Sequence, residues 1–327
     1  MIANTLVEVN NRLGNFTFIL ISVVLSAVVC FKAIPFTTDL MVNSAAGLAG
    51  KYFGSNQRTL VINASTNNPE LFSMLISLSL LRLGGIANPL GSNFTNMYLM
   101  FFIAPVFVAG KWLLTGRSDK LLSLRKLVNK ERGLFLWHTL IAFFMFVFAS
   151  LAYWCLTGAF QFSPVTENAP RQWYWLVTSG IIGVCGVFLY LFFERNLKRQ
   201  RPELFDDIND EQQNASWSAF GVGTIGLIAS TYILNSLFLA WTELYSDSLS
   251  SIFGVAIFAG LHYFVGSIVT SLPELTVAVE NYERLTSPDL NTALASASAS
   301  NMTNLAIAAI GAILATVIAG FHFQISL

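Results

Sequence analysis

The chain has 327 residues, of which 54% are hydrophobic and only 11% are charged, and its formal net charge is zero. Soluble globular chains carry about 25% charged residues, so this composition excludes an ordinary soluble domain. Its apolar stretches reach the roughly 20 residues that a bilayer-spanning helix needs, and they lack the short alternating pattern of a membrane β-barrel. We therefore predict an all-α, polytopic membrane protein. The expected partner is the lipid bilayer, and no nucleic-acid partner is predicted.

Hydropathy predicts about eight transmembrane helices in chain order, and these divide the chain into two halves. The first half covers 1–193, a charged linker covers 194–217, and the second half covers 218–327. All three cysteines fall within apolar spans and predict neither a disulfide framework nor a metal site. The predicted spans are 16–36 (continuing towards 50), 59–82, 88–110, 134–156, 172–194, 218–242, 250–281 and 289–325.

Lysine and arginine are distributed unevenly between the loops on the two sides of these spans. Fourteen of the 18 fall on one side, half of them in the segment 111–132, whereas three fall on the other side. The positive-inside rule makes the fourteen-charge side cytoplasmic, so we expect both termini outside a plasma (inner) membrane. The basic amphipathic segment 111–132 is predicted to lie at the cytoplasmic membrane surface. We expect no cleavable signal at the N-terminus.

Two pairs of segments repeat one another. "NASTNNPELF" at 63–72 matches "SIVTSLPELT" at 267–276 with a shift of 204, and "ANPLGSNFTN" at 87–96 matches "ASASASNMTN" at 295–304 with a shift of 208. Chance matches in this chain would be mostly apolar, but these are mostly polar, so we infer a duplication. Five predicted spans separate the copies, and an odd number inverts the second copy. Inverted repeats with interrupted helices are typical of secondary transporters.

Each copy places one acid, Glu70 or Glu274, directly after a proline inside an apolar segment. A proline in a helix leaves the carbonyl four residues back without its partner, here that of Ser65 or Val269. An acid within a membrane span is costly and indicates a functional site. Polar residues at helical spacing share the face of each acid. The two copies together predict an all-oxygen cage of formal charge about −2, which suits hard cations such as Ca²⁺ and Na⁺.

The Ala/Ser-rich run at 290–304 resembles a flexible linker, yet it leads into the last apolar stretch. Its polar residues Ser296, Ser300 and Asn304 are spaced to form one stripe on a helix, and the first copy repeats this spacing at 88, 92 and 96. Small residues also let two helices approach closely. Packing alone could explain such a run, but the two acids in register favour hydroxyls that face an ion path.

At these residues the sequence resembles the calcium/cation antiporter superfamily, the sodium/calcium exchanger group. Members carry two inverted α-repeats, each with a G-T-S-x-P-E motif followed by a G-N-x-x-G-S-N-x-x-N/D motif. "TSLPEL" and "NPLGSNFTN" fit closely, and the resemblance covers about 37–100 and 240–310. The resemblance implies exchange of Na⁺, H⁺ or K⁺ against Ca²⁺ by alternating access. The metal ligands that it implies are Thr66, Asn67, Glu70, Ser92, Asn96, Thr270, Ser271, Glu274, Ser300 and Asn304.

The chain departs from this family in two respects. Exchangers of this group often have an acid where this chain has Asn304. They also commonly have ten helices, two more than the eight predicted here. We expect a secondary active antiporter that exchanges Ca²⁺ against Na⁺ or H⁺. A monovalent cation exchanger (Na⁺/H⁺ or Na⁺/K⁺) is an alternative, because two Na⁺ or two protons would neutralise two carboxylates. A non-transporting member of the fold is another, because Ser65, Val269 and Ala299 replace motif glycines. The sequence shows no enzyme motif, no resident cofactor is expected, and the oligomeric state stays open.

Overall fold

A computed structural model describes seven ranges of the chain, and every regular element in them is a helix. Six helical stretches are long and apolar enough to cross a membrane, so the chain is an all-α, multi-pass membrane protein. These stretches are Asn15–Tyr52, Asn88–Leu114, Arg132–Leu156, Tyr174–Gln200, Trp217–Leu234 and Ser287–Val317. The described ranges are 2–52, 58–79, 84–157, 173–205, 216–253, 267–268 and 270–318.

Six of the eight predicted spans coincide with these stretches. The predicted span 59–82 is divided into two helices, and residues 254–266 and 269 of the predicted span 250–281 lie outside the described residues. Residues 319–327, at the end of the last predicted span, also lie outside them. The count of eight therefore stays a prediction. The helices are α1 Ile2–Leu13, α2 Asn15–Val28, α3 Ile34–Tyr52, α4 Arg58–Thr66, α5 Asn68–Ser79, α6 Gly84–Tyr98, α7 Ala104–Leu114, α8 Ser118–Lys130, α9 Arg132–Thr157, α10 Trp173–Gln200, α11 Trp217–Phe253, α13 Leu272–Arg284 and α14 Ser287–Ile318.

Short π-helical segments join some of these helices end to end. The segment η1 (Val29–Ala33) connects α2 to α3, and η3 (Leu99–Ile103) connects α6 to α7. The predicted first span therefore belongs to one helical stretch that continues to Tyr52. At the other end of the first half, α10 continues to Gln200 and is followed by the 3-10 turn η4 (Pro202–Leu204). The predicted linker 194–217 thus begins as a helix, and its residues 206–215 lie outside the described ranges.

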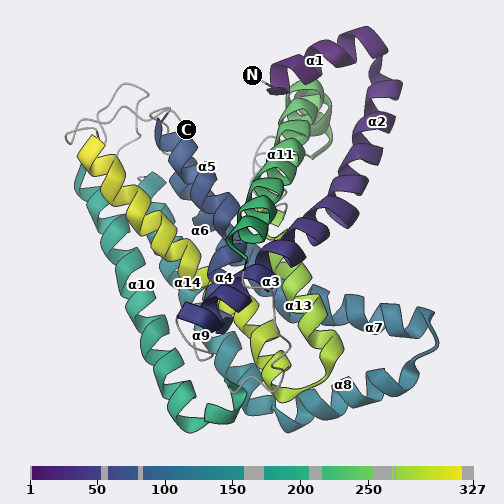
Figure 1. Ribbon diagram of the computed structural model, residues 1–327. Coiled ribbons are helices and arrows are strands. Elements are labelled where there is room, and N and C mark those ends of the chain that lie inside the picture. The colour runs from purple at the N-terminus through teal and green to yellow at the C-terminus, as the bar shows by residue number, and fades with distance from the viewer. Residues whose placement is uncertain are drawn as a thin grey trace.

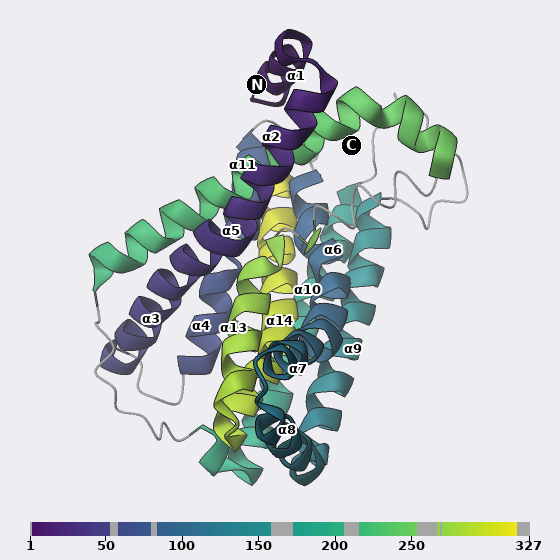
Figure 2. The ribbon, with the colours of Figure 1, turned by 90° about the vertical axis from the view of Figure 1, so that its right-hand side faces the viewer.

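Helix α14 passes through the middle of the bundle, where it contacts α4, α5, α6, α9, α10 and α13 (Figures 1 and 2). In its most apolar stretch 61% of the residues are buried, against 22% to 33% in the other five candidate spans. The Ala/Ser run forms the N-terminal half of this helix. Alanine and serine side chains leave room for several neighbours at once, which explains why the most crowded helix has the smallest side chains.

Helices α3 and α11 pack closely against each other on the side of the molecule away from α10 (Figure 1). A Cβ atom added at Gly223 of α11 would lie 2.6 Å from the backbone nitrogen of Met41 on α3. One added at Gly226 would lie 2.6 Å from Cγ2 of Thr37. Glycine at these two positions therefore permits the close approach of the two helix backbones.

We expect Gly223→Ala to destabilise the protein, because the new methyl group meets backbone rather than a movable side chain. Overpacking of this kind costs about 1–3 kcal/mol. Gly221→Ala is the matched control on the same helix, since a Cβ atom there meets nothing within 4 Å. Alanine is the better helix former, so this control should be neutral or slightly stabilising. Thermal unfolding of both variants in detergent measures the difference, and equal unfolding temperatures would contradict the prediction.

The segments that carry most of the basic residues gather at one end of the bundle. Figure 2 shows α8, the turn between α13 and α14 and the end of α10 at the lower end, whereas α1 lies at the upper end. Helix α8 connects two candidate spans at this lower end, as expected for a segment at a membrane surface. The assignment of the lower end to the cytoplasm stays a prediction.

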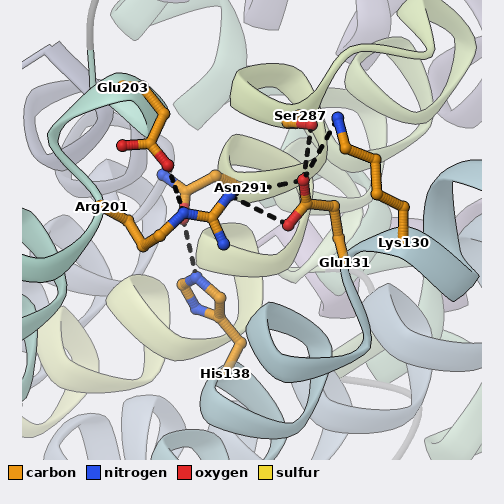
Figure 3. Close-up of polar contacts among 7 residues, drawn as sticks. All are labelled: Lys130, Glu131, His138, Arg201, Glu203, Ser287 and Asn291. Atoms are coloured by element: carbon orange, nitrogen blue, oxygen red, sulfur yellow. Dashed lines mark hydrogen bonds and ion pairs between the residues drawn. The ribbon is translucent and has the colours of Figure 1, made fainter.

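A polar cluster ties three helices together at the lower end (Figure 3). Glu131, between α8 and α9, is almost fully buried. Its carboxylate accepts a hydrogen bond from Ser287 Oγ at 2.8 Å and another from Arg201 Nη2 at 3.2 Å. Nearby on α9, His138 Nε2 lies 2.9 Å from Asn291 Oδ1. These contacts fix α9 and the end of α10 against the first turns of α14.

Candidate cation-binding site

A helix is interrupted at one position in each copy of the repeat, and the two positions are equivalent. Asn67 occupies a turn between α4 and α5, and Ser271 occupies a turn before α13. The next helices begin with equivalent bonds, from Leu71 N to Asn67 O and from Leu275 N to Ser271 O, each 3.1 Å long. Each interruption lies two residues before the proline that predicts it. The carboxylates thus stand in the first turn of a helix, where the positive end of the helix dipole favours negative charge.

Both glutamates are fully buried, with 0% of each side chain exposed. The hydroxyls of Ser92 and Thr270 lie beside the Glu70 carboxyl, and those of Thr66 and Ser300 lie beside the Glu274 carboxyl. Each acid is therefore flanked by the serine of its own copy and the threonine of the other copy. The two carboxyls are close enough to repel each other.

Direct hydrogen bonds join the two copies around the acids. Ser92 Oγ lies 3.1 Å from Thr270 Oγ1. Ser300 Oγ is central: it donates to Asn67 Oδ1 at 3.0 Å or to Glu274 Oε1 at 3.1 Å, and it accepts from Asn96 Nδ2 at 3.0 Å. Helices α6, α13 and α14 and the turn between α4 and α5 thus meet at one place.

The structure buries all ten of the predicted ligands. The contacts just described join eight of them in one cluster. The other two, Ser271 and Asn304, are fully buried, and their side-chain polar atoms have no hydrogen-bond partner among the described residues. Both occupy positions equivalent to clustered residues of the first copy, Asn67 and Asn96.

Seven buried side-chain atoms of the predicted ligands make no hydrogen bond of normal geometry within the described residues. Six are oxygens, namely both carboxylate oxygens of Glu70, Oε2 of Glu274, Oδ1 of Asn96 and Asn304, and Oγ of Ser271, and the seventh is Nδ2 of Asn304. A buried polar atom without a partner costs about 1–3 kcal/mol, so this group of atoms indicates a bound group that supplies their interactions. Because six of the seven are oxygens and two of the residues are acids, a hard cation fits the set best.

The donor set contains few acids. Within the described ranges, no three His, Cys, Asp or Glu side chains come together as a metal-binding group. A cation here would therefore be held by two carboxylates, with hydroxyl and amide oxygens supplying the remaining ligands. Soft transition metals prefer thiolate and imidazole ligands, and neither belongs to this set.

The sequence reasoning overlooked two residues at this site, Asn93 and Asn301. Both are fully buried, and each bonds the backbone of the other. The signal was available, because the 208-residue shift that relates Ser92 to Ser300 also relates these two asparagines. Their role was missed because neither lies on the polar stripe of its helix.

No protein-family model, curated protein or solved structure matches this chain. Membership of the exchanger superfamily therefore rests on the motifs and stays a proposal.

Proposed function

We propose that this chain is a secondary active cation antiporter of the sodium/calcium exchanger type, which exchanges Ca²⁺ against Na⁺ or H⁺ by alternating access. One observation carries the proposal: two fully buried carboxylates, on two interrupted helices from corresponding parts of the chain, share a cluster of oxygen ligands. Acids within membrane-spanning regions mark ion pathways and coupling sites. A structural role accounts poorly for a pair of acids that repel each other.

The charge of the site explains how competing ions would share it. Two carboxylates carry a formal charge of about −2, which one Ca²⁺, two Na⁺ or two protons would neutralise. An empty site leaves two buried charges unbalanced, which is costly in low dielectric. The carrier therefore switches between its outward-facing and inward-facing states most readily when a cation neutralises the site. This requirement couples the movement of one ion to the return movement of another.

We further propose the finer architecture that the repeat predicts. The two copies would form inverted α-repeats within about eight transmembrane helices, with both termini outside the plasma (inner) membrane. Each glutamate lies beside the serine of its own copy and the threonine of the other copy, and this reciprocal arrangement supports a two-fold relation between the copies. The gathering of basic segments at one end of the bundle supports the orientation.

Exchange of monovalent cations is the second candidate. The ligand set favours it in one respect, because Asn304 stands where the exchanger group often has a third acid. A site with only two carboxylates attracts a divalent ion less strongly.

A flux assay on liposomes tests the proposal. The purified protein is reconstituted with a Ca²⁺ indicator inside the vesicles, and an outward Na⁺ gradient or a pH gradient is imposed. We expect Ca²⁺ uptake that depends on the gradient and is absent from protein-free vesicles. Na⁺-driven change of internal pH without Ca²⁺ movement would favour the monovalent exchanger. No ion movement under any gradient would contradict both functions.

A further inference from the structure

The side chains of Asn93 on α6 and Asn301 on α14 form a reciprocal pair of hydrogen bonds. Asn93 Nδ2 donates to the carbonyl oxygen of Asn301 at 3.2 Å, and Asn301 Nδ2 donates to that of Asn93 at 3.0 Å. Both side chains are fully buried. The orientation of each amide is settled by chemistry, because the reverse orientation would place two oxygen acceptors against each other.

This pair lies at the level of the candidate ion site. Asn93 directly follows Ser92, and Asn301 directly follows Ser300. Three side-chain hydrogen bonds therefore join α6 to α14 within about one helical turn, the third being from Asn96 to Ser300. A direct bond from an asparagine amide to the backbone of a neighbouring helix requires a close approach of the two helices.

Both hydrogen bonds end on backbone carbonyls, those of Asn301 and Asn93. Each amide holds the carbonyl of the residue after a site serine, so the position of the serine hydroxyl follows from the position of the partner helix. The other contacts of these serines reach the turn between α4 and α5, at Asn67, and the segment at the start of α13, at Thr270 and Glu274. Moving α6 away from α14 would therefore enlarge the cage between the two acids.

We propose that Asn93 and Asn301 are positioning residues, which set the spacing of the Ser92 and Ser300 hydroxyls and so the size of the cation that the site accepts. This inference rests on the proposed cation exchange. The Nδ2 atoms of the pair bond backbone carbonyls, and their Oδ1 atoms are buried without a hydrogen-bond partner among the described residues. Selection between cations of equal charge depends on cavity size, ligand number and ligand flexibility. A fixed spacing disfavours Ba²⁺, which is larger than Ca²⁺ but has the same charge.

Leucine substitutions test this role, because leucine has nearly the shape of asparagine and no hydrogen-bond donor. We expect Asn93→Leu and Asn301→Leu each to weaken Ca²⁺ binding about tenfold, as loss of one buried hydrogen bond predicts. Ba²⁺ binding should weaken by less than about threefold, since a looser cage fits the larger ion better. Calorimetric titration of the purified protein with each ion measures this ratio.

Ile86→Ala is the matched control. Ile86 is also fully buried on α6 and lies against α14 near Gly311, away from the serines. This variant should lower the unfolding temperature and leave the Ca²⁺/Ba²⁺ affinity ratio unchanged. If the leucine variants also lose stability without any change in that ratio, the pair is merely structural and the inference is overturned.

A distance measurement is independent of ion binding. Spin labels at Phe102, in the segment η3 that continues α6, and at Ile310 on α14, both exposed, report the spacing of the two helical stretches in a variant whose native cysteines are replaced by alanine. We expect a narrow distance distribution that broadens in the Asn93→Leu/Asn301→Leu variant, and an unchanged distribution would overturn the inference. If the wild-type protein binds neither Ca²⁺ nor Na⁺, the proposed function fails instead. The label distances then still decide whether the pair sets the helix spacing.

Discussion

Replacing Glu70 or Glu274 by glutamine is expected to reduce gradient-driven Ca²⁺ flux at least about a hundredfold, because removing one partner of a buried charge interaction costs about 3–5 kcal/mol. Glutamine keeps the shape of the side chain and removes its charge. The formal charge of the site falls from about −2 to −1, which no longer balances a divalent ion. The two variants should behave alike, because each acid is flanked by an equivalent serine and threonine.

The same variants should unfold at a higher temperature than the wild-type protein when a chelator is present. Without an ion, the two buried carboxyls repel each other, and glutamine removes that repulsion. Loss of transport together with a gain in stability distinguishes a functional acid from a structural one. A structural acid would lose stability on substitution.

Glu283→Gln is the matched control for this pair. Glu283 lies on α13 with Glu274, but its side chain is 28% exposed and pairs with Lys111. An exposed ion pair contributes at most about 1 kcal/mol, so this variant should keep both flux and stability. Wild-type flux in both Glu70→Gln and Glu274→Gln would contradict the proposed role of the acids, as would an equal loss in Glu283→Gln.

The position of the acids could be predicted from the sequence because two local rules define it. A proline marks a helix interruption, and helical periodicity assigns Ser92 and Asn96 to one face. The repeat then supplied the second copy. Together these rules marked the polar faces that contain the ligands implied by the family resemblance, and the structure brings eight of those residues together, although the interruptions lie at Asn67 and Ser271, two residues before the prolines.

Contacts that depend on the meeting of particular helices could not be predicted in this way. Glu131 bonds residues 70 and 156 positions away, and nothing in the local pattern identifies Arg201 or Ser287 as its partners. The close approach at Gly223 is similar, because a glycine in an apolar helix reads as ordinary packing until its neighbour is known. Periodicity defines the faces of a helix but not the helix that each face meets.

Asn304→Asp is expected to increase Ca²⁺ affinity at least about tenfold, because affinity for Ca²⁺ rises with the number of charged ligands. Asn304 is the favourable position for this change. Its side chain is fully buried, and neither Oδ1 nor Nδ2 has a hydrogen-bond partner among the described residues. The substitution therefore adds a third carboxylate without breaking a bond that the structure shows.

The equivalent residue of the first copy provides the control for Asn304→Asp. Asn96 Nδ2 donates to Ser300 Oγ, so Asn96→Asp adds the same charge but replaces a donor with an acceptor. We expect a smaller gain in Ca²⁺ affinity for Asn96→Asp, measured by calorimetric titration. In the presence of a chelator, Asn304→Asp should unfold at a lower temperature than the wild type, and added Ca²⁺ should reverse this difference. Unchanged affinity in Asn304→Asp would mean that this side chain does not face the ion.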